Sequence, residues 1–115
     1  MEFVFIPSKC KGETKTFEGT ITLKVLSTPE KFRLMAKCEF EIGEDGVAKK
    51  NLKQLNAIAD LIEYTKPYFL KIDLKKIDGS KEFKSYDDLQ YDDECSDILI
   101  EASTQFLNGF KLGNG

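Results

Sequence analysis

Histidine is absent from this chain of 115 residues, and its three cysteines lie far apart, at Cys10, Cys38 and Cys95. A cysteine nucleophile needs a base that removes the thiol proton, most often histidine. The common zinc sites need histidine or Cys-x-x-Cys pairs, and the sequence contains neither. An odd number of widely spaced cysteines also argues against a disulfide framework. We therefore expect free thiols, no catalytic residues and no metal site.

The sequence also lacks a strong excess of charge and any long apolar run. Its net charge of -3 comes without a basic stripe or tail, which argues against a nucleic-acid partner. The apolar run Phe3–Ile6 is too short for a signal peptide or a membrane span. The glycines are scattered and form no phosphate-binding loop. We expect a cytoplasmic protein that is not an enzyme, uses no cofactor and does not bind membranes.

What the chain does contain is the periodicity of a small globular protein, with 41% hydrophobic and 32% charged residues. Two strands are predicted in the first third, at Phe3–Ile6 and Thr16–Val25, with a loop over Ser8–Lys15 between them. In the second strand apolar and polar side chains alternate, which predicts one buried face and one solvated face.

Two helices are predicted next. Ser27 and Glu30 have the spacing of a capping box, and Pro29 suits the first turn of the helix that follows. The buried stripe expected in this first helix comprises Phe32, Met35, Ala36 and Phe40. A second helix is predicted over Val47–Tyr64 and ends before Pro67. Its expected buried stripe comprises Ala48, Leu52, Leu55, Ala59 and Ile62, widened by Ile58 and Leu61.

A β-hairpin is predicted around Asp78-Gly79, placed at the two central positions of a tight turn. In this register Phe83 shares one face with Leu70, Ile72 and Leu74. On the other face, opposite charges lie directly across the strands, which stabilises the pairing. These cross-strand pairs are Lys75 with Glu82 and Asp73 with Lys84.

After the hairpin, Tyr86–Tyr91 predicts a turn of helix, and Asp92-Asp93-Glu94 marks the start of a last helix. The buried stripe expected in the last helix comprises Cys95, Ile98, Leu99, Ala102 and Phe106. We expect the acidic residues here to cap helices, because the alternate-position ligands and central glycine of a calcium loop are missing. Phe106 and Phe110 are either core residues or an exposed docking edge, and we take them as candidate partner contacts.

These elements predict an α+β fold, with an antiparallel sheet of three to four strands and two to three helices packed on it. We expect a single domain over residues 1–111, followed by a flexible C-terminal tail at residues 112–115.

The order of motifs resembles that of the small tail assembly chaperones of long-tailed bacteriophages, the lambda-like frameshifted tail assembly protein family. The early part of the resemblance is a Gly-x-Ile-x-Leu-x-Val strand, here Gly19–Val25, followed by Ser-x-Pro-Glu-x-Phe-x-Leu, here Ser27–Leu34. The later part is an alternating strand, an Asp-Gly turn, an aromatic residue and Asp-x-Leu. It corresponds to Leu70–Leu74, Asp78-Gly79, Phe83 and Tyr86–Leu89.

The resemblance implies a non-enzymatic chaperone that binds the phage tape measure protein in the host cytoplasm during tail morphogenesis. Contacts with the tail tube protein and self-association are further expectations. No functional residue of the family maps onto a position here. Two alternatives remain open: a structural tail subunit (tube, connector or terminator) retained in the virion, and a generic small protein-binding adaptor or inhibitor.

Overall fold

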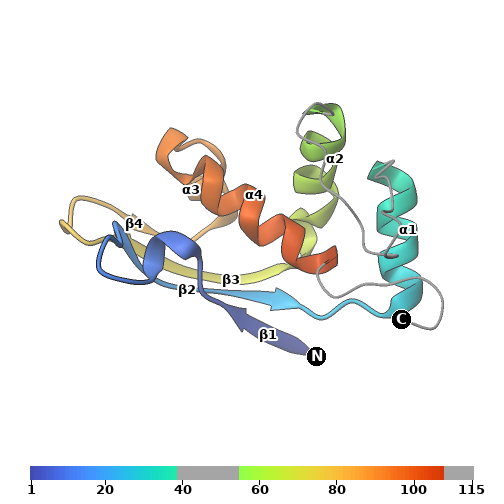
Figure 1. Cartoon of the computed structure of the whole chain (residues 1–115), viewed down its shortest axis with the longest axis horizontal. Coiled ribbons are helices and arrows are strands. Elements are labelled where there is room, and N and C mark those ends of the chain that lie inside the picture. The colour runs from blue at the N-terminus through green and yellow to red at the C-terminus, as the bar shows by residue number, and fades with distance from the viewer. Residues whose placement is uncertain (39–54, 108–115) are drawn as a thin grey trace. The chain divides into compact units, whose positions relative to one another are not determined.

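The computed structural model of the chain describes residues 1–38 and 55–107 (Figure 1). The chain groups into two compact units. The first comprises Met1–Val25 and Lys66–Ala102, and the second comprises the described parts of Leu26–Thr65 and Ser103–Gly115. The described residues form a four-stranded antiparallel sheet and α-helices, which confirms the predicted α+β class.

The sheet belongs to the first unit and has the strand order β1-β2-β3-β4. Its strands are β1 (Glu2–Phe5), β2 (Phe17–Lys24), β3 (Phe69–Lys76) and β4 (Glu82–Phe83), and each pairs antiparallel with the next. Both strands predicted in the first third are therefore confirmed. The apolar face of the sheet is buried through side chains of β2, β3 and β4: Phe17, Ile21, Leu23, Ile72, Leu74 and Phe83.

The hairpin between β3 and β4 has the predicted register. Leu74 pairs with Phe83, and Lys75 pairs with Glu82. The turn itself differs, because the Gly79 N–H donates to the Lys76 carbonyl at 2.9 Å, which centres the turn on Ile77 and Asp78. The register survives because the Lys76 N–H donates to the Lys81 carbonyl, also at 2.9 Å. A four-residue loop keeps the same residues opposite each other as a two-residue loop centred at the same place.

Leu70 does not share the buried face of Ile72 and Leu74, and its side chain is 49% exposed. The pairing of β2 with β3 shifts register between Thr22 and Leu23, so that Leu23 pairs with Phe69 while Thr22 pairs with Lys71. Leu70 is the extra residue of this β-bulge, and a bulge breaks the alternation of side chains along a strand. The predicted position of Leu70 was therefore wrong.

The helical segments after the hairpin are α3 (Tyr86–Gln90), a 3-10 turn at Asp93–Cys95, α4 (Ser96–Thr104) and a 3-10 turn at Gln105–Leu107. Within the first unit, α3 and the Ser96–Ala102 part of α4 lie on the same side of the sheet (Figure 1). The predicted stripe of the last helix is confirmed, since all its members are buried: Cys95, Ile98, Leu99, Ala102 and Phe106.

The connection between β1 and β2 is held against α4. Its 3-10 turn, Ser8–Cys10, directs the Ser8 N–H to Glu101 Oε1 at 2.8 Å. The Lys9 ammonium donates to the Glu94 carbonyl at 2.9 Å. This loop is thereby fixed to α4 and to the 3-10 turn before it, which follow the loop by more than eighty residues.

The second unit contains α1 (Thr28–Cys38) and α2 (Leu55–Thr65). The capping box at the start of α1 is confirmed: the Ser27 N–H donates to Glu30 Oε1 at 3.0 Å, and the Glu30 N–H donates to Ser27 Oγ at 3.3 Å. The stripe predicted for this helix was partly wrong. Met35 is buried, but Phe32 is 45% exposed and Ala36 is exposed.

The buried residues of α1 are instead Leu34, Met35 and Cys38, so the buried face is rotated from the predicted one. Packing of α1 on α2 selects this face, since the α1 sequence carries apolar residues on more than one side. Phe40, the last residue of the predicted stripe, lies outside the described residues.

The stripe predicted for α2 was also wrong in part. Ile58 and Leu61 are buried as expected, together with Ala57 and Thr65. Leu55, however, is 72% exposed, and Ala59 is exposed. Burial of Thr65 is possible because its hydroxyl donates to the Leu61 carbonyl at 2.6 Å. Ala48 and Leu52, which belong to the same predicted stripe, lie outside the described residues.

Phe83 tests the register of the hairpin. Its side chain is fully buried, and its ring lies 5.8 Å from the ring of Phe17. We expect Phe83→Ala to lower the free energy of unfolding by roughly 3 kcal/mol or more, measured by urea denaturation. The control is Lys75→Ala, which removes only an exposed ion pair and should change stability by less than about 1 kcal/mol. Equal effects of the two substitutions would contradict this core.

Candidate protein-binding surfaces

Of the two aromatic residues proposed as partner contacts, the structure describes only Phe106. Phe106 is only 2% exposed, so the core alternative applies to it and the docking alternative was wrong. The physical reason is that its 3-10 turn, Gln105–Leu107, contacts α1 within the second unit. Phe110 lies outside the described residues.

The thiols are poor nucleophiles in this fold. Burial, reinforced by nearby carboxylates, raises the pKa of Cys38 and of Cys95 to about 11. The carboxylates are those of Asp60 for Cys38 and Asp92 for Cys95. Burial also raises the pKa of Cys10, with Glu101 adding to the effect. At neutral pH these three side chains are therefore protonated, and a protonated thiol neither attacks a substrate nor binds a metal well.

Two of the acidic residues after the hairpin, Asp88 and Asp92, cap helical segments, as predicted. Asp88 forms a capping box with Ser85 at the start of α3 and also accepts from the Lys84 N–H at 3.0 Å. Asp92 caps the following 3-10 turn by accepting from the Glu94 N–H at 2.9 Å. The described part of the chain contains no group of three or more acidic, cysteine or histidine side chains that could hold a metal ion.

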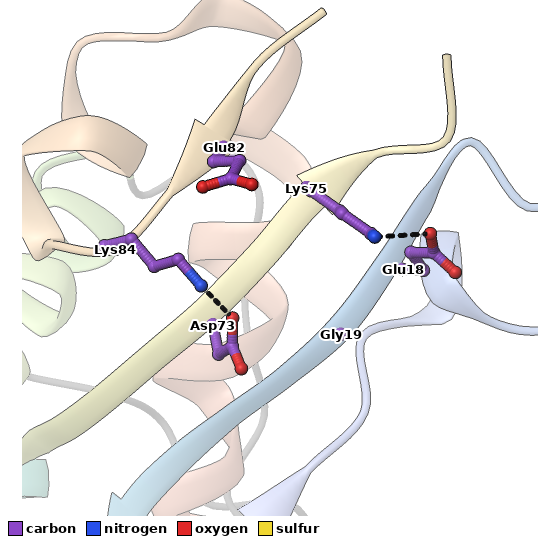
Figure 2. A pocket seen from close by; sticks show the side chains of 6 residues that line it. All are labelled: Glu18, Gly19, Asp73, Lys75, Glu82 and Lys84. Atoms are coloured by element: carbon purple, nitrogen blue, oxygen red, sulfur yellow. Dashed lines mark hydrogen bonds and ion pairs between the residues drawn. The ribbon is translucent and has the colours of Figure 1, made fainter. Parts of the chain in front are cut away.

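The face of the sheet opposite α3 carries a shallow pocket of about 330 Å³ (Figure 2). Its lining is almost entirely charged, with Glu18, Gly19, Asp73, Lys75, Glu82 and Lys84 around it. Lys84 pairs with Asp73 as predicted, whereas the Lys75 ammonium lies 3.3 Å from Glu18 on β2. These exposed pairs neutralise each other and contribute little to stability.

Gly19 allows β2 and β3 to approach closely beside this pocket. Its φ angle is +126°, and a Cβ atom added to it would lie 1.9 Å from the Asp73 carbonyl oxygen. Only glycine accommodates both constraints. The exposed backbone of Gly19 thus lies among the charged side chains that line this pocket.

Apolar side chains are exposed on α2. Leu55, Ala59 and Ile62 follow the spacing i, i+4, i+7, which places them along one line of the helix surface. Leu55 is 72% exposed, Ala59 is exposed and Ile62 is partly buried. We call these three residues the outer stripe of α2. It borders the buried face formed by Ile58 and its neighbours, so the apolar surface of this helix is wider than the part that the unit covers.

Comparisons of this chain with protein-family models, with curated proteins and with solved structures find no match. Among the described helices, none has both the length and the apolar character needed to cross a membrane.

The capping of α3 predicts a pH dependence of stability. Hydrogen bonds from the Lys84 backbone N–H, then from Ser85, lower the pKa of Asp88 below its ordinary value. A carboxyl group with a lowered folded-state pKa stabilises the fold above its unfolded pKa of about 3.9, and the effect is lost as the pH falls through the folded-state pKa.

We therefore expect Asp88→Ala to destabilise the protein at pH 6 to 7, with the difference from wild type shrinking as the pH falls below the unfolded pKa and through the lowered folded-state pKa. Urea denaturation across this pH range measures the effect. Asp88→Asn is the matched control, because its amide oxygen still accepts a hydrogen bond but does not titrate. A difference between wild type and Asp88→Ala that stays constant with pH would contradict this role.

Proposed function

We propose that this chain is a non-enzymatic tail assembly chaperone of a long-tailed bacteriophage, which binds the tape measure protein in the host cytoplasm. The order of motifs, from Gly19–Val25 to Tyr86–Leu89, supports the family. The observation that carries the binding role is the outer stripe of α2, an apolar line on a helix that is already packed on its other side.

A chaperone for a long helical client needs apolar surface that stays accessible after the chaperone has folded. Amphipathic helices are commonly recognised through apolar anchors that meet a complementary apolar surface. The outer stripe offers Leu55 as the most exposed anchor, with Ala59 and Ile62 continuing it toward the C-terminal end of α2. Such contacts would cover apolar side chains of the client that otherwise drive aggregation.

The outer stripe replaces Phe106 as the proposed contact surface. Phe106 is buried, and exposing it would cost the packing of a large aromatic side chain in the second unit. Binding at the outer stripe requires no such rearrangement. The protonated state of the thiols also favours a binding role over covalent chemistry.

A structural tail subunit retained in the virion is the second candidate, because β1 lies at an edge of the sheet. Rings of subunits often use such edges. Mass spectrometry of purified phage particles separates the two candidates: a chaperone should be absent from the particles, and a structural subunit should be present in stoichiometric amounts. The generic adaptor has no specific observation in its favour.

Leu55→Glu tests the proposed binding surface. Placing a charge at the most exposed position of the outer stripe should reduce co-purification of the tape measure protein roughly tenfold or more, because binding would bury that charge. The folded state should persist, since Leu55 is 72% exposed. The matched control is Tyr91→Glu, which places the same charge at a side chain that is 81% exposed in the first unit. Equal loss with both variants would contradict a specific role of α2.

Two further observations decide the proposal as a whole. Tape measure protein produced beside this chain should be more soluble than tape measure protein produced alone. A tape measure gene should lie directly downstream of the gene for this chain. If the client stays equally insoluble with and without the chain, the chaperone proposal fails.

A further inference from the structure

The two edge strands of the sheet differ in length and therefore in how many backbone groups they offer to another strand. At one edge, β4 has only two residues, Glu82 and Phe83, which pair with Leu74 and Lys75 of β3. At the other edge, β1 runs over Glu2–Phe5 and, among the described strands, pairs only with β2 (Figure 1). Its pairing is regular over all four residues. Charged residues, prolines and bulges protect edge strands from pairing with other chains. Of these features β1 has one, the charged residue Glu2.

The hydrogen-bonding direction along β1 follows from the contacts around it. The Val25 N–H donates to the Met1 carbonyl at 3.0 Å, so Met1 and Val25 form a hydrogen-bonded pair. Hydrogen-bonded and non-hydrogen-bonded pairs alternate in an antiparallel ladder. Phe3 and Phe5 therefore direct their backbone groups to β2, while Glu2 and Val4 direct theirs away from the sheet.

The side chains at this edge are apolar on both faces. Val4 is 61% exposed on the face that also carries Thr22, its partner on β2. Phe3 and Phe5 are partly buried on the other face. Ile6, 43% exposed, follows the strand and precedes a proline, which favours an extended backbone there. A strand added beside β1 would cover apolar surface on both sides of the sheet.

We propose that β1 is a self-association edge, on which β1 of a second copy of this chain pairs antiparallel with Val4 opposite Val4. This register uses the outward backbone groups of Val4 on both copies, because a hydrogen-bonded antiparallel pair exchanges both N–H···O bonds. It also sets Phe3 against Phe5 of the second copy, and Glu2 against Ile6 of the second copy. No like charges meet, whereas a register with Glu2 opposite Glu2 would repel.

Because the two edge strands differ in length, they determine how many copies of the chain can associate. A two-fold pairing of β1 with β1 consumes the long edge of both copies, and the remaining outer edges are the two-residue β4 strands. Such an isologous contact closes after two copies, unlike a head-to-tail contact between different edges. The inference therefore specifies a dimer, and it does not depend on the tape measure protein being the client.

Val4→Pro tests the edge. Proline removes the outward N–H and places its ring where the second strand would lie, but the Val4 N–H takes no part in the ladder with β2. Sedimentation equilibrium of the full chain between about 10 μM and 1 mM covers the range for a small interface. We expect wild type and the control Val4→Thr to reach the mass of two chains, and Val4→Pro to stay at the mass of one chain with an unchanged circular dichroism spectrum. A wild type of single-chain mass throughout, or a folded Val4→Pro that dimerises like wild type, would overturn the proposal.

A charge pair at the same position tests the register and remains decisive if Val4→Pro does not fold. With Val4 opposite Val4, Val4→Lys and Val4→Glu should each weaken self-association roughly tenfold or more, because like charges then face each other. An equimolar mixture of the two variants should form a mixed dimer. Failure of the mixture to associate overturns the pairing. Stronger dimerisation of Val4→Lys alone would also overturn this register, since it would place position 4 opposite Glu2.

Discussion

The hydrogen-bond ladder of β2 holds the first unit together. Residues of β2 alternate in direction: Ile21 and Leu23 bond toward β1, whereas Thr20 and Thr22 bond toward β3. The same strand directs Ile21 and Leu23 to the buried face. Because β1 and β4 make no ladder without β2 and β3, the placement of the edge, the charged pocket and the helices above the sheet all depend on this central pair.

The features that could be predicted from the sequence are those determined by neighbouring residues. The capping box of Ser27 and Glu30 and the register of Leu74 with Phe83 both depend on short spacings, and the structure has both. The stripe of the last helix was also predictable, because its apolar residues repeat along one face, with Ile100 as the exception.

The remaining features depend on packing and strand pairing between separate elements, which the local sequence pattern does not determine. Two apolar stripes run along α2, and the one that packs contains Ala57 and Thr65, whose burial relies on a hydrogen bond to the Leu61 carbonyl. The bulge at Leu70 arises where β3 adjusts to β2, which no periodicity within β3 reveals. From the sequence alone Phe106 could be a core residue or an exposed docking residue, because an apolar side chain suits both. Its packing in the second unit makes it a core residue, and the surface that would bind a partner stays a proposal.

The close approach at Gly19 has a consequence for how this protein tolerates change. Solvent exposure is the usual guide to whether a position accepts substitution, and Gly19 is exposed. Yet any other residue would bring its Cβ to 1.9 Å from the Asp73 carbonyl oxygen and would also hold a strained φ of +126°. In a saturation mutagenesis experiment this surface position would behave like a core residue. The neighbouring charged positions around the pocket would tolerate most replacements, so the outer face of the sheet would show one intolerant point within a permissive surface.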